Sequence, residues 1–242
     1  MTAIYKRELH SFFVTPMGYI YIAMFWAISS FVFSMFTFLA GSEASVSTYF
    51  TVELIVIALM SPLLTMKAFS EEKKLRTEQL LLTSPVSLSG FVAAKFFASY
   101  TMFVLTFLVS CINLPVMFFY ISDQTNYYTY NAPQALGGCI ALLLVGATFI
   151  AIGMLISALT ENQMIAAVGT LAVSIILLGV SLLNTYISFA PIRVIFNWLS
   201  IYARFSNFTK GYFDIASLIY YVTFAFTCLF VTVRIYEKRR WA

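Results

Sequence analysis

The chain has 242 residues and a net charge of +4, and 61% of its residues are hydrophobic while only 10% are charged. Soluble domains carry about 25% charged residues, so this composition excludes an ordinary soluble domain and indicates that lipid surrounds most of the chain. The basic residues lie scattered at the ends of apolar runs and form no stripe with aromatic residues, which argues against a nucleic-acid partner.

The first predicted element is an amphipathic helix at residues 3–15 that lies in the membrane interface. At about 100° per residue, one side of this helix is apolar and the opposite side is polar. The apolar side holds Ile4, Tyr5, Leu9, Phe12 and Phe13, and the polar side holds Lys6, Arg7, His10 and Ser11. Glu8 is the exception, because it falls inside the apolar arc. We interpret His10, which follows two basic residues, as a lipid headgroup contact rather than a ligand.

Six apolar runs are long enough to cross a bilayer, whose hydrocarbon core of about 30 Å takes about 20 helical residues. They lie near residues 18–40, 50–69, 89–120, 135–159, 163–184 and 213–235. Backbone groups in lipid must be satisfied within their own segment, so each run should be a helix. The predicted fold is therefore a single all-α integral membrane domain over residues 1–242, with six transmembrane helices after the interfacial helix.

The fourth and fifth spans are joined by the short turn at 160–163, which forces them into an antiparallel pair. Small residues in both spans would let their backbones approach closely. They are Gly137, Gly138, Gly146, Gly153 and Ser157 in one span and Gly169, Ala172 and Gly179 in the other. The third span is longer than a bilayer needs and contains Asn113 and Pro115, so we expect it to tilt or to kink.

The positions of lysine and arginine predict the topology. With the N-terminus inside, eleven of the fourteen basic residues fall at cytoplasmic ends of spans, so both termini are expected in the cytoplasm. The outer connections are then 41–49, 121–134 and 185–212, and the last carries Arg193, Arg204 and Lys210. Its apolar composition predicts a hairpin that dips into the outer leaflet or lies on it. Lys95, about two turns into the third span, is expected to snorkel back to the cytoplasm.

The connection at 70–87, between the second and third spans, holds the densest cluster of charge. Ser70 is expected to cap a cytoplasmic helix at residues 71–83, which Ser84 and Pro85 would end. Two pairs of opposite charge four residues apart would support this helix. They are Glu72 with Arg76 and Lys74 with Glu78. The alternative interpretation is an ordinary solvated loop between two spans.

The sequence contains no motif for catalysis or nucleotide binding. It has no phosphate-binding loop, nucleophile elbow or zinc motif, and its one histidine cannot build a metal site or a triad. Glu53 and Asp214 fall near the outer ends of their spans, where an interfacial carboxylate costs little, so a structural role is the preferred interpretation. Cys111, Cys139 and Cys228 are widely spaced within apolar segments and are interpreted as packing residues. We expect no cofactor, metal or catalytic residue in this chain.

Four stretches, in order along the whole chain, resemble those of ABC-2-type transporter permeases. The charged stretch EEKKLRTEQLLLTSPVS resembles the family's first cytoplasmic connection, and YKRELHSFFVTPMGYI resembles its amphipathic elbow helix. ISALTENQMIAA is similar to its second cytoplasmic turn, and LSIYARFSNFTKGYFDI is similar to the outer hairpin before its last helix. Within the family, the chain resembles the gliding-motility-type permeases, a bacterial group whose operons also encode an ATPase and an auxiliary protein.

The resemblance implies a type V exporter-like transmembrane domain in the bacterial cytoplasmic membrane, without a nucleotide site of its own. A separate ATP-binding cassette subunit, in two copies, would bind ATP and Mg²⁺. Two permease protomers, identical or related, would form a dimer, and their first, second and fifth spans would line the route between them. By the same resemblance, the residues that couple to the ATPase would be Glu71, Glu72, Lys73, Lys74, Arg76, Thr77 and Glu78, with Glu161, Asn162 and Gln163 as a smaller second contact.

Three hypotheses about function follow. The first is the membrane subunit of an ATP-driven exporter. The second is mechanotransmission, in which ATP drives an extracytoplasmic partner without transport of cargo, and in which an exposed Arg193, Arg204 and Lys210 would contact that partner. The third, an intramembrane enzyme that works with carboxylates alone, has the least support, because no polar constellation recurs at membrane depth.

Overall fold

The computed structural model describes residues 2–38, 46–75, 87–116, 132–186, 196, 198 and 200–241. Within these ranges the chain is helical and contains no strand. Six of the helices are long and apolar enough to cross a membrane, which confirms the predicted all-α, six-span membrane fold.

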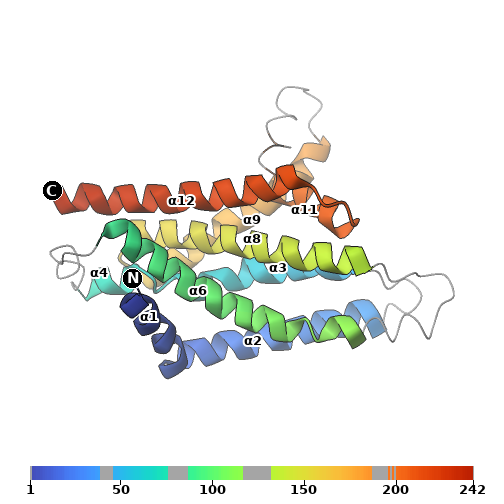
Figure 1. Cartoon of the computed structure of the whole chain (residues 1–242), viewed down its shortest axis with the longest axis horizontal. Helices are drawn as coiled ribbons and strands as arrows, with labels where there is room; N and C mark the ends of the chain where they lie inside the picture. The colour runs from blue at the N-terminus through green and yellow to red at the C-terminus, as the bar shows by residue number, and fades with distance from the viewer. Residues whose placement is uncertain are drawn as a thin grey trace.

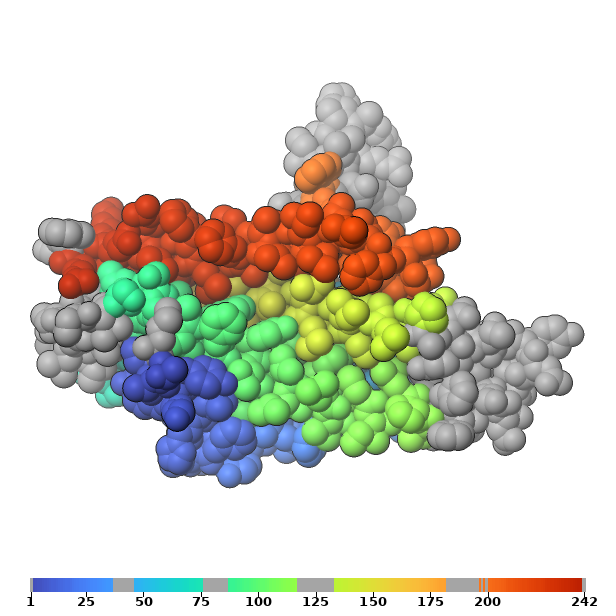
Figure 2. Space-filling view, in the orientation of Figure 1, coloured from blue at the N-terminus to red at the C-terminus, as the bar shows by residue number. Residues whose placement is uncertain are grey.

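The helices run along the chain in the order shown in Figure 1. They are α1 (Thr2–Val14), α2 (Pro16–Phe33), which continues as the π-helical η1 (Ser34–Phe38), α3 (Val46–Thr65), α4 (Ser70–Lys74), α6 (Leu88–Ser110), α8 (Ala132–Leu159), α9 (Gln163–Tyr186), α11 (Ile201–Thr209) and α12 (Ile215–Trp241). The membrane-length helices are α2, α3, α6, α8, α9 and α12, and each overlaps one of the predicted spans. The short α1 overlaps the predicted interfacial helix at 3–15 and packs against α6 (Figure 2).

One end of the bundle gathers α4, the N-terminal helix α1 and the C-terminal end of α12, as Figure 1 shows. The last turn of α12 carries Lys238, Arg239 and Arg240, so this end is rich in basic residues. The short helix α11 lies at the opposite end (Figure 1). The two termini therefore share one end of the bundle, as an even number of spans requires.

The interior of the bundle is formed by α3 and α8. In the most apolar window of each span, 72% of the α3 residues and 61% of the α8 residues are buried, against 22% for α9 and 28% for both α2 and α12. The helix α8 has the highest mean hydropathy of the six, 2.7, and packs against α3, α6, α9, α11 and α12. Hydropathy alone does not give α8 its central place, because an apolar face can also point at lipid and α9, with a mean hydropathy of 2.3, is the least buried of the six.

The glycines of α8 make room mainly for helices other than the predicted partner α9. A Cβ atom at Gly138 would collide with the Phe50 ring of α3, and one at Gly146 would collide with the Phe103 ring of α6. Between α8 and α9, a Cβ atom on Gly169 would lie 3.0 Å from Ile156. The small residues therefore allow close packing, but they distribute it over several neighbours of α8.

The third membrane-length helix loses its regular pattern where the sequence predicted a disturbance. The helix α6 ends at Ser110, and the backbone N–H of Ile112 donates to the carbonyl of Val109, three residues back, at 3.1 Å. A tightened turn of this kind is common where an α-helix ends or bends. Asn113 and Pro115 follow directly, in a further helical turn.

Candidate functional site

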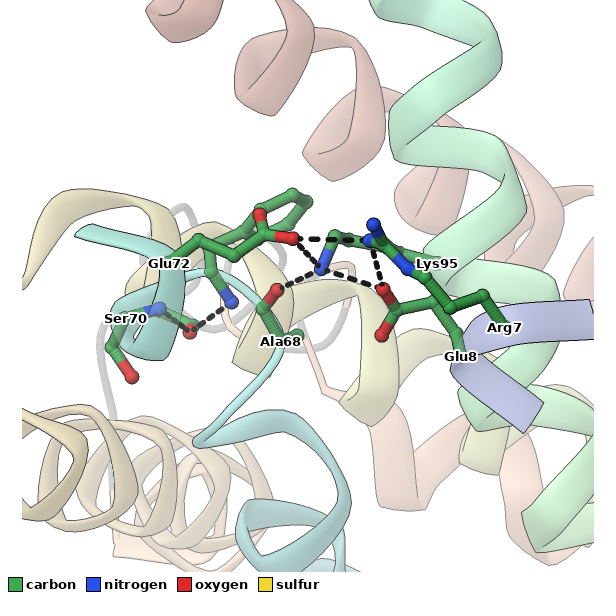
Figure 3. A network of polar contacts seen from close by, with 8 residues as sticks. Arg7, Glu8, Ala68, Ser70, Glu72 and Lys95 are labelled. Carbon is green, nitrogen blue, oxygen red and sulfur yellow. Dashed lines mark hydrogen bonds and ion pairs between the residues drawn. The ribbon is translucent and has the colours of Figure 1, made fainter. Parts of the chain in front are cut away.

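Four charged side chains meet where α1, α4 and α6 come together, and we call them the ion-pair cluster: Arg7, Glu8, Glu72 and Lys95 (Figure 3). The Lys95 Nζ atom lies 2.9 Å from Oε1 of Glu72 and 3.3 Å from Oε1 of Glu8. The Nη2 atom of Arg7 lies 2.7 Å from Oε1 of Glu8 and 3.4 Å from Oε1 of Glu72. Each cation thus contacts both carboxylates, and the cluster links three helices that are distant in sequence.

Lys95 is the buried centre of the cluster. Its side chain is only 3% exposed, and its Nζ atom also donates a hydrogen bond to the carbonyl of Ala68 at 2.6 Å. The ammonium group lies 5.4 Å and 5.2 Å from the ring centroids of Phe69 and Phe91, within the range of a cation–π contact. The prediction that Lys95 snorkels to solvent is therefore wrong. Two carboxylates from other helices provide its counter-charge inside the protein, so the side chain does not need water.

Glu8 and Arg7 bring the interfacial helix α1 into the cluster. The hydrogen bond from Arg7 to Glu8 raises the pKa of the Arg7 guanidinium above its ordinary value, so this residue stays charged at every physiological pH. The position of Glu8 inside the apolar arc of α1 is now explained, because this side of α1 faces the buried ammonium of Lys95.

The helix α4 is held by the end of α8. The Ser157 hydroxyl of α8 accepts hydrogen bonds from the backbone N–H groups of Phe69 and Ser70, at 3.1 Å and 3.2 Å. The Nζ atom of Lys73 donates to the carbonyl of Ala158. The first turn of α4 and the last turn of α8 are therefore fastened together by three bonds, two of which satisfy amides that a helix start leaves without partners.

The prediction that Ser70 caps this helix is wrong. Ser70 is already the first helical residue, and its hydroxyl donates to the carbonyl of Met66 in the preceding turn. The capping oxygen comes from Ser157, which is distant in sequence, so no local pattern could have indicated it.

Three aromatic rings connect this region to the last helix. The ring centroid of Phe69 lies 5.1 Å from that of Tyr236 in α12 and 5.9 Å from that of Phe91 in α6. All three rings are buried. The segment around α4 is thereby packed against α12 as well as bonded to α6 and α8.

The two segments that the resemblance assigned to coupling lie at the same end of the bundle. Glu161 and Asn162 are exposed in the turn between α8 and α9, where the Asn162 side chain accepts from the N–H of Met164 at 2.9 Å and so caps α9. The helix α4 contacts both α8 and α9. Within α4, Lys74 is exposed, Glu71 and Glu72 are half-buried and Lys73 is buried. Gln163 is half-buried as the first residue of α9. The other predicted coupling residues, Arg76, Thr77 and Glu78, lie outside the described residues, as does the rest of the predicted helix at 71–83 beyond Leu75.

The structure describes two of the three residues that were predicted to contact an outer partner. Arg204 is half-buried, with its guanidinium carbon 4.3 Å from the ring centroid of Tyr220 and 5.1 Å from that of Trp198, so the prediction that it is exposed is wrong. Flat aromatic rings give the guanidinium a packing partner, which explains its burial. Lys210 is exposed, and Arg193 lies outside the described residues.

The two carboxylates Glu53 and Asp214 differ from each other in their surroundings. Asp214 caps α12: its Oδ1 atom accepts from the N–H of Ala216 at 3.0 Å, and its Oδ2 atom accepts from the Ser217 hydroxyl at 2.6 Å. The Ser217 hydrogen bond lowers the pKa of Asp214. Glu53, by contrast, is fully buried within the bundle rather than interfacial, so the prediction of a low-cost interfacial position is wrong for this residue.

Among the described residues, no group of three or more His, Cys, Asp or Glu side chains could hold a metal ion.

Comparison of the chain with known proteins shows the family to which it belongs. None of the curated proteins matches the chain. The family model described as ABC-2 family transporter protein matches residues 42–236, a range that begins before α3 and ends within α12. It includes α4, Lys95, Ser157 and the turn between α8 and α9. Because the match covers more than half of a chain with six membrane-length helices, this multi-pass membrane protein belongs to the ABC-2 family and is a permease subunit of an ABC transporter.

Proposed function

We propose that this permease is driven by a separate ATP-binding cassette ATPase, which contacts α4 and the turn between α8 and α9. The observation that carries the proposal is the ion-pair cluster, because it joins the charged segment after α3 to both α1 and α6. The chain has no phosphate-binding loop, so ATP and Mg²⁺ belong to the partner subunit. Export of a substrate is the direction that we propose.

The contacts of α4 suit this helix to move as a rigid body together with its neighbours. A force on its exposed Lys74 would pass through Glu72 to Lys95 in α6, and through Lys73 to the end of α8. Separating Lys95 from its carboxylates would leave a buried charge without a partner, at a cost of about 3–5 kcal/mol. Movement of α4 together with α1, α6 and α8 therefore costs less than movement of α4 alone, as a shear or hinge mechanism needs.

A dimer with a route between its protomers is supported by the distribution of buried surface. The helices α2, α9 and α12 bury little of their surface within one chain, so most of their apolar side chains are available to lipid or to a second protomer. A groove of about 380 Å³ lies between α3 and α9, lined on the α9 side by Ile175 and Leu178 and closed by Tyr202 of α11. We propose a dimer of permeases with two ATPase copies, in the bacterial cytoplasmic membrane with both termini in the cytoplasm.

Mechanotransmission is a second candidate, favoured by one observation at the outer end. Trp198, Tyr212 and Phe213 are each more than half exposed and lie in or beside the segment that contains α11, close in sequence to the exposed Lys210. Exposed aromatic residues beside a cation suit an extracytoplasmic auxiliary protein as well as the interfacial belt of a membrane protein. Stimulation of ATP hydrolysis by an outer protein without any cargo would distinguish this function from export.

The proposal is tested with the permease expressed together with its ATPase and reconstituted in liposomes. The variant Lys74→Glu/Glu161→Lys reverses two exposed charges on the proposed contact, and we expect it to retain less ATPase on purification and to uncouple hydrolysis from transport. The control Lys210→Glu reverses an exposed charge at the opposite end and should behave as wild type. Full coupling in the double variant would contradict the assignment of this contact.

A further inference from the structure

Glu53 is a carboxyl group buried at membrane depth without a hydrogen-bond partner. It lies in α3, about two turns after the first residue, Val46. The residue is 0% exposed, and neither of its carboxylate oxygens has a hydrogen-bond partner among the described residues. An ionised carboxylate in such a place is costly, and intramembrane acidic residues usually pair with a cation or mark an ion pathway.

Oxygen atoms from three helices surround this carboxyl group. Ser29 of α2 and Ser110 of α6 lie beside it, and their Oγ atoms form a hydrogen bond of 2.9 Å with each other. Both serines are buried. Tyr49, one turn before Glu53 on α3, is also buried and lies beside the same two serines and Asn113. The cluster thus offers one carboxylate, two aliphatic hydroxyls, a phenol and an amide.

No basic side chain of the described residues supplies the missing positive charge. The other titratable groups that face this region are Tyr21 of α2 and Cys111 at the end of α6, and neither is cationic. The ion pairs of the described residues involve other carboxylates, those of Glu8, Glu72 and Glu237. An ionised Glu53 would therefore need a counter-charge from outside the described residues, whereas a bound proton would remove that need.

A small pocket is lined by the two serines. It has a volume of about 210 Å³, lies between α2 and α6, and is lined by Trp26, Ser29, Ser30, Ser110 and Asn113 among others. The indole N–H of Trp26 donates to the carbonyl of Thr106 at 3.0 Å, which fixes the edge of the pocket. Two of the hydroxyls that line the pocket, those of Ser29 and Ser110, are the ones beside Glu53, so a small polar species in the pocket would come close to the carboxyl group.

We propose that Glu53, Ser29, Ser110 and Tyr49 form a binding site for a small monovalent cation, which enters through the pocket between α2 and α6. Carboxylate, hydroxyl and amide oxygens are ligands that hard cations such as Na⁺ prefer. A single carboxylate balances a single positive charge, whereas a divalent ion would leave an excess charge in a medium of low dielectric constant. The bound ion would hold α2, α3 and α6 together. This inference does not depend on the proposed ATPase contact.

The test uses the purified full-length chain in detergent, with NaCl or KCl replaced stepwise by choline chloride at constant ionic strength. An ion that binds only the folded state raises the melting temperature as its concentration rises. We expect Na⁺ or K⁺ to give this increase and choline to give none, and radioactive sodium or rubidium to bind in a saturable way.

The variant Glu53→Gln keeps the shape of the side chain and removes its charge. We expect it to fold with a melting temperature in choline at or above that of the wild type, since no buried charge is left, and to bind the ion at least about tenfold more weakly. Ser110→Ala removes one ligand without changing the charge and should weaken binding by a smaller factor. The matched control Ser206→Ala removes a hydroxyl of α11 and should bind normally.

Three outcomes would overturn the proposal. Absence of any difference between the alkali ions and choline would show that no such ion binds. Binding that is unchanged in Glu53→Gln would place the ion elsewhere. A melting temperature that depends on pH alone, with no effect of the ion, would show that a proton neutralises Glu53 without a cation site.

Discussion

The ammonium group of Lys95 in α6 and the carboxylate of Glu72 in α4 form an ion pair of 2.9 Å whose lysine side is almost fully shielded from solvent. Exposed ion pairs contribute about 0–1 kcal/mol, whereas the loss of one partner from a buried pair is costly. This difference makes the pair a firm connection between α6 and the segment that follows α3. It also makes Lys95 the residue with which to test the ion-pair cluster.

Replacing Lys95 by methionine retains most of the side-chain volume and removes the charge. Glu8 and Glu72 then face each other with Arg7 as the one remaining cation of the cluster, and we expect the free energy of unfolding to fall by about 1–3 kcal/mol. Equilibrium unfolding in mixed micelles measures this loss.

The control for this variant is Lys74→Met, because Lys74 is exposed and lies on α4, the helix that carries Glu72. We expect this change to alter the free energy of unfolding by no more than about 0.5 kcal/mol. In the double variant Lys95→Met/Glu72→Gln, the loss should be smaller than the sum of the single losses, since each removes the partner of the other. Additive losses would show that the two side chains do not interact.

The sequence was sufficient for the fold but not for the cluster. Apolar runs of membrane length predicted the six spans, because the pattern that a bilayer demands is local. Lys95 and Glu8 each stand out in the sequence as a charge in an apolar setting, but the sequence suggests a reason only for Lys95, that its side chain snorkels. Their pairing joins residues of α1 and α6, and one sequence alone does not show which distant charges pair. The available indication is that Glu8 and Lys95 have opposite charges and both lie in apolar stretches, so each could neutralise the other.

The errors for Ser70, Arg204 and Glu53 share one physical cause. A local pattern indicates what a side chain is able to do, such as to cap a helix or to reach solvent, while the packing of other helices decides what it does. Ser157 caps α4 in place of Ser70, and two aromatic rings cover Arg204. Glu53 is drawn into the bundle because the helix that carries it, α3, is the most buried of the six.

Removing the Ser157 hydroxyl should loosen α4 without unfolding the bundle. Ser157→Ala leaves the N–H groups of Phe69 and Ser70 without their acceptor, and the loss of a helix cap typically costs about 1 kcal/mol. Amide hydrogen exchange of residues 69–75 should therefore become faster, while exchange in the middle of α8 should not change. The control Thr160→Ala removes a hydroxyl that bonds only within α8, to Ile156. Faster exchange of the same segment in this control would contradict a specific role for Ser157.

Asp214 makes the start of α12 sensitive to acid. Because its pKa is lower in the folded state than the usual value for aspartate of about 3.9, its contribution to stability is complete above that value. The contribution is lost as the pH falls through the folded-state pKa. The difference in unfolding free energy between wild type and Asp214→Asn should therefore be constant from neutral pH down to about pH 5 and should shrink below about pH 4. Asp214→Ser keeps an uncharged capping oxygen, so its stability should lack this acid-dependent part.

The contact between α8 and α6 can be tested at Gly146. A Cβ atom at this position would collide with the ring of Phe103, which cannot move aside easily because its centroid lies 5.9 Å from that of Phe107 and 6.1 Å from that of Tyr100. Overpacking of this kind costs about 1–3 kcal/mol, so Gly146→Ala should destabilise the protein although alanine favours a helix.

The matched control is Gly179→Ala in α9, where a Cβ atom would meet nothing within 4 Å among the described residues. There the higher helix propensity of alanine should act alone and raise the free energy of unfolding by up to about 1 kcal/mol. Shortening the ring in Gly146→Ala/Phe103→Leu should recover part of the loss at Gly146, because leucine frees the space that the new methyl group takes. If Gly146→Ala were as stable as Gly179→Ala, α6 could not lie against α8 at this depth, and the position of Lys95 on the same helix would have to be revised.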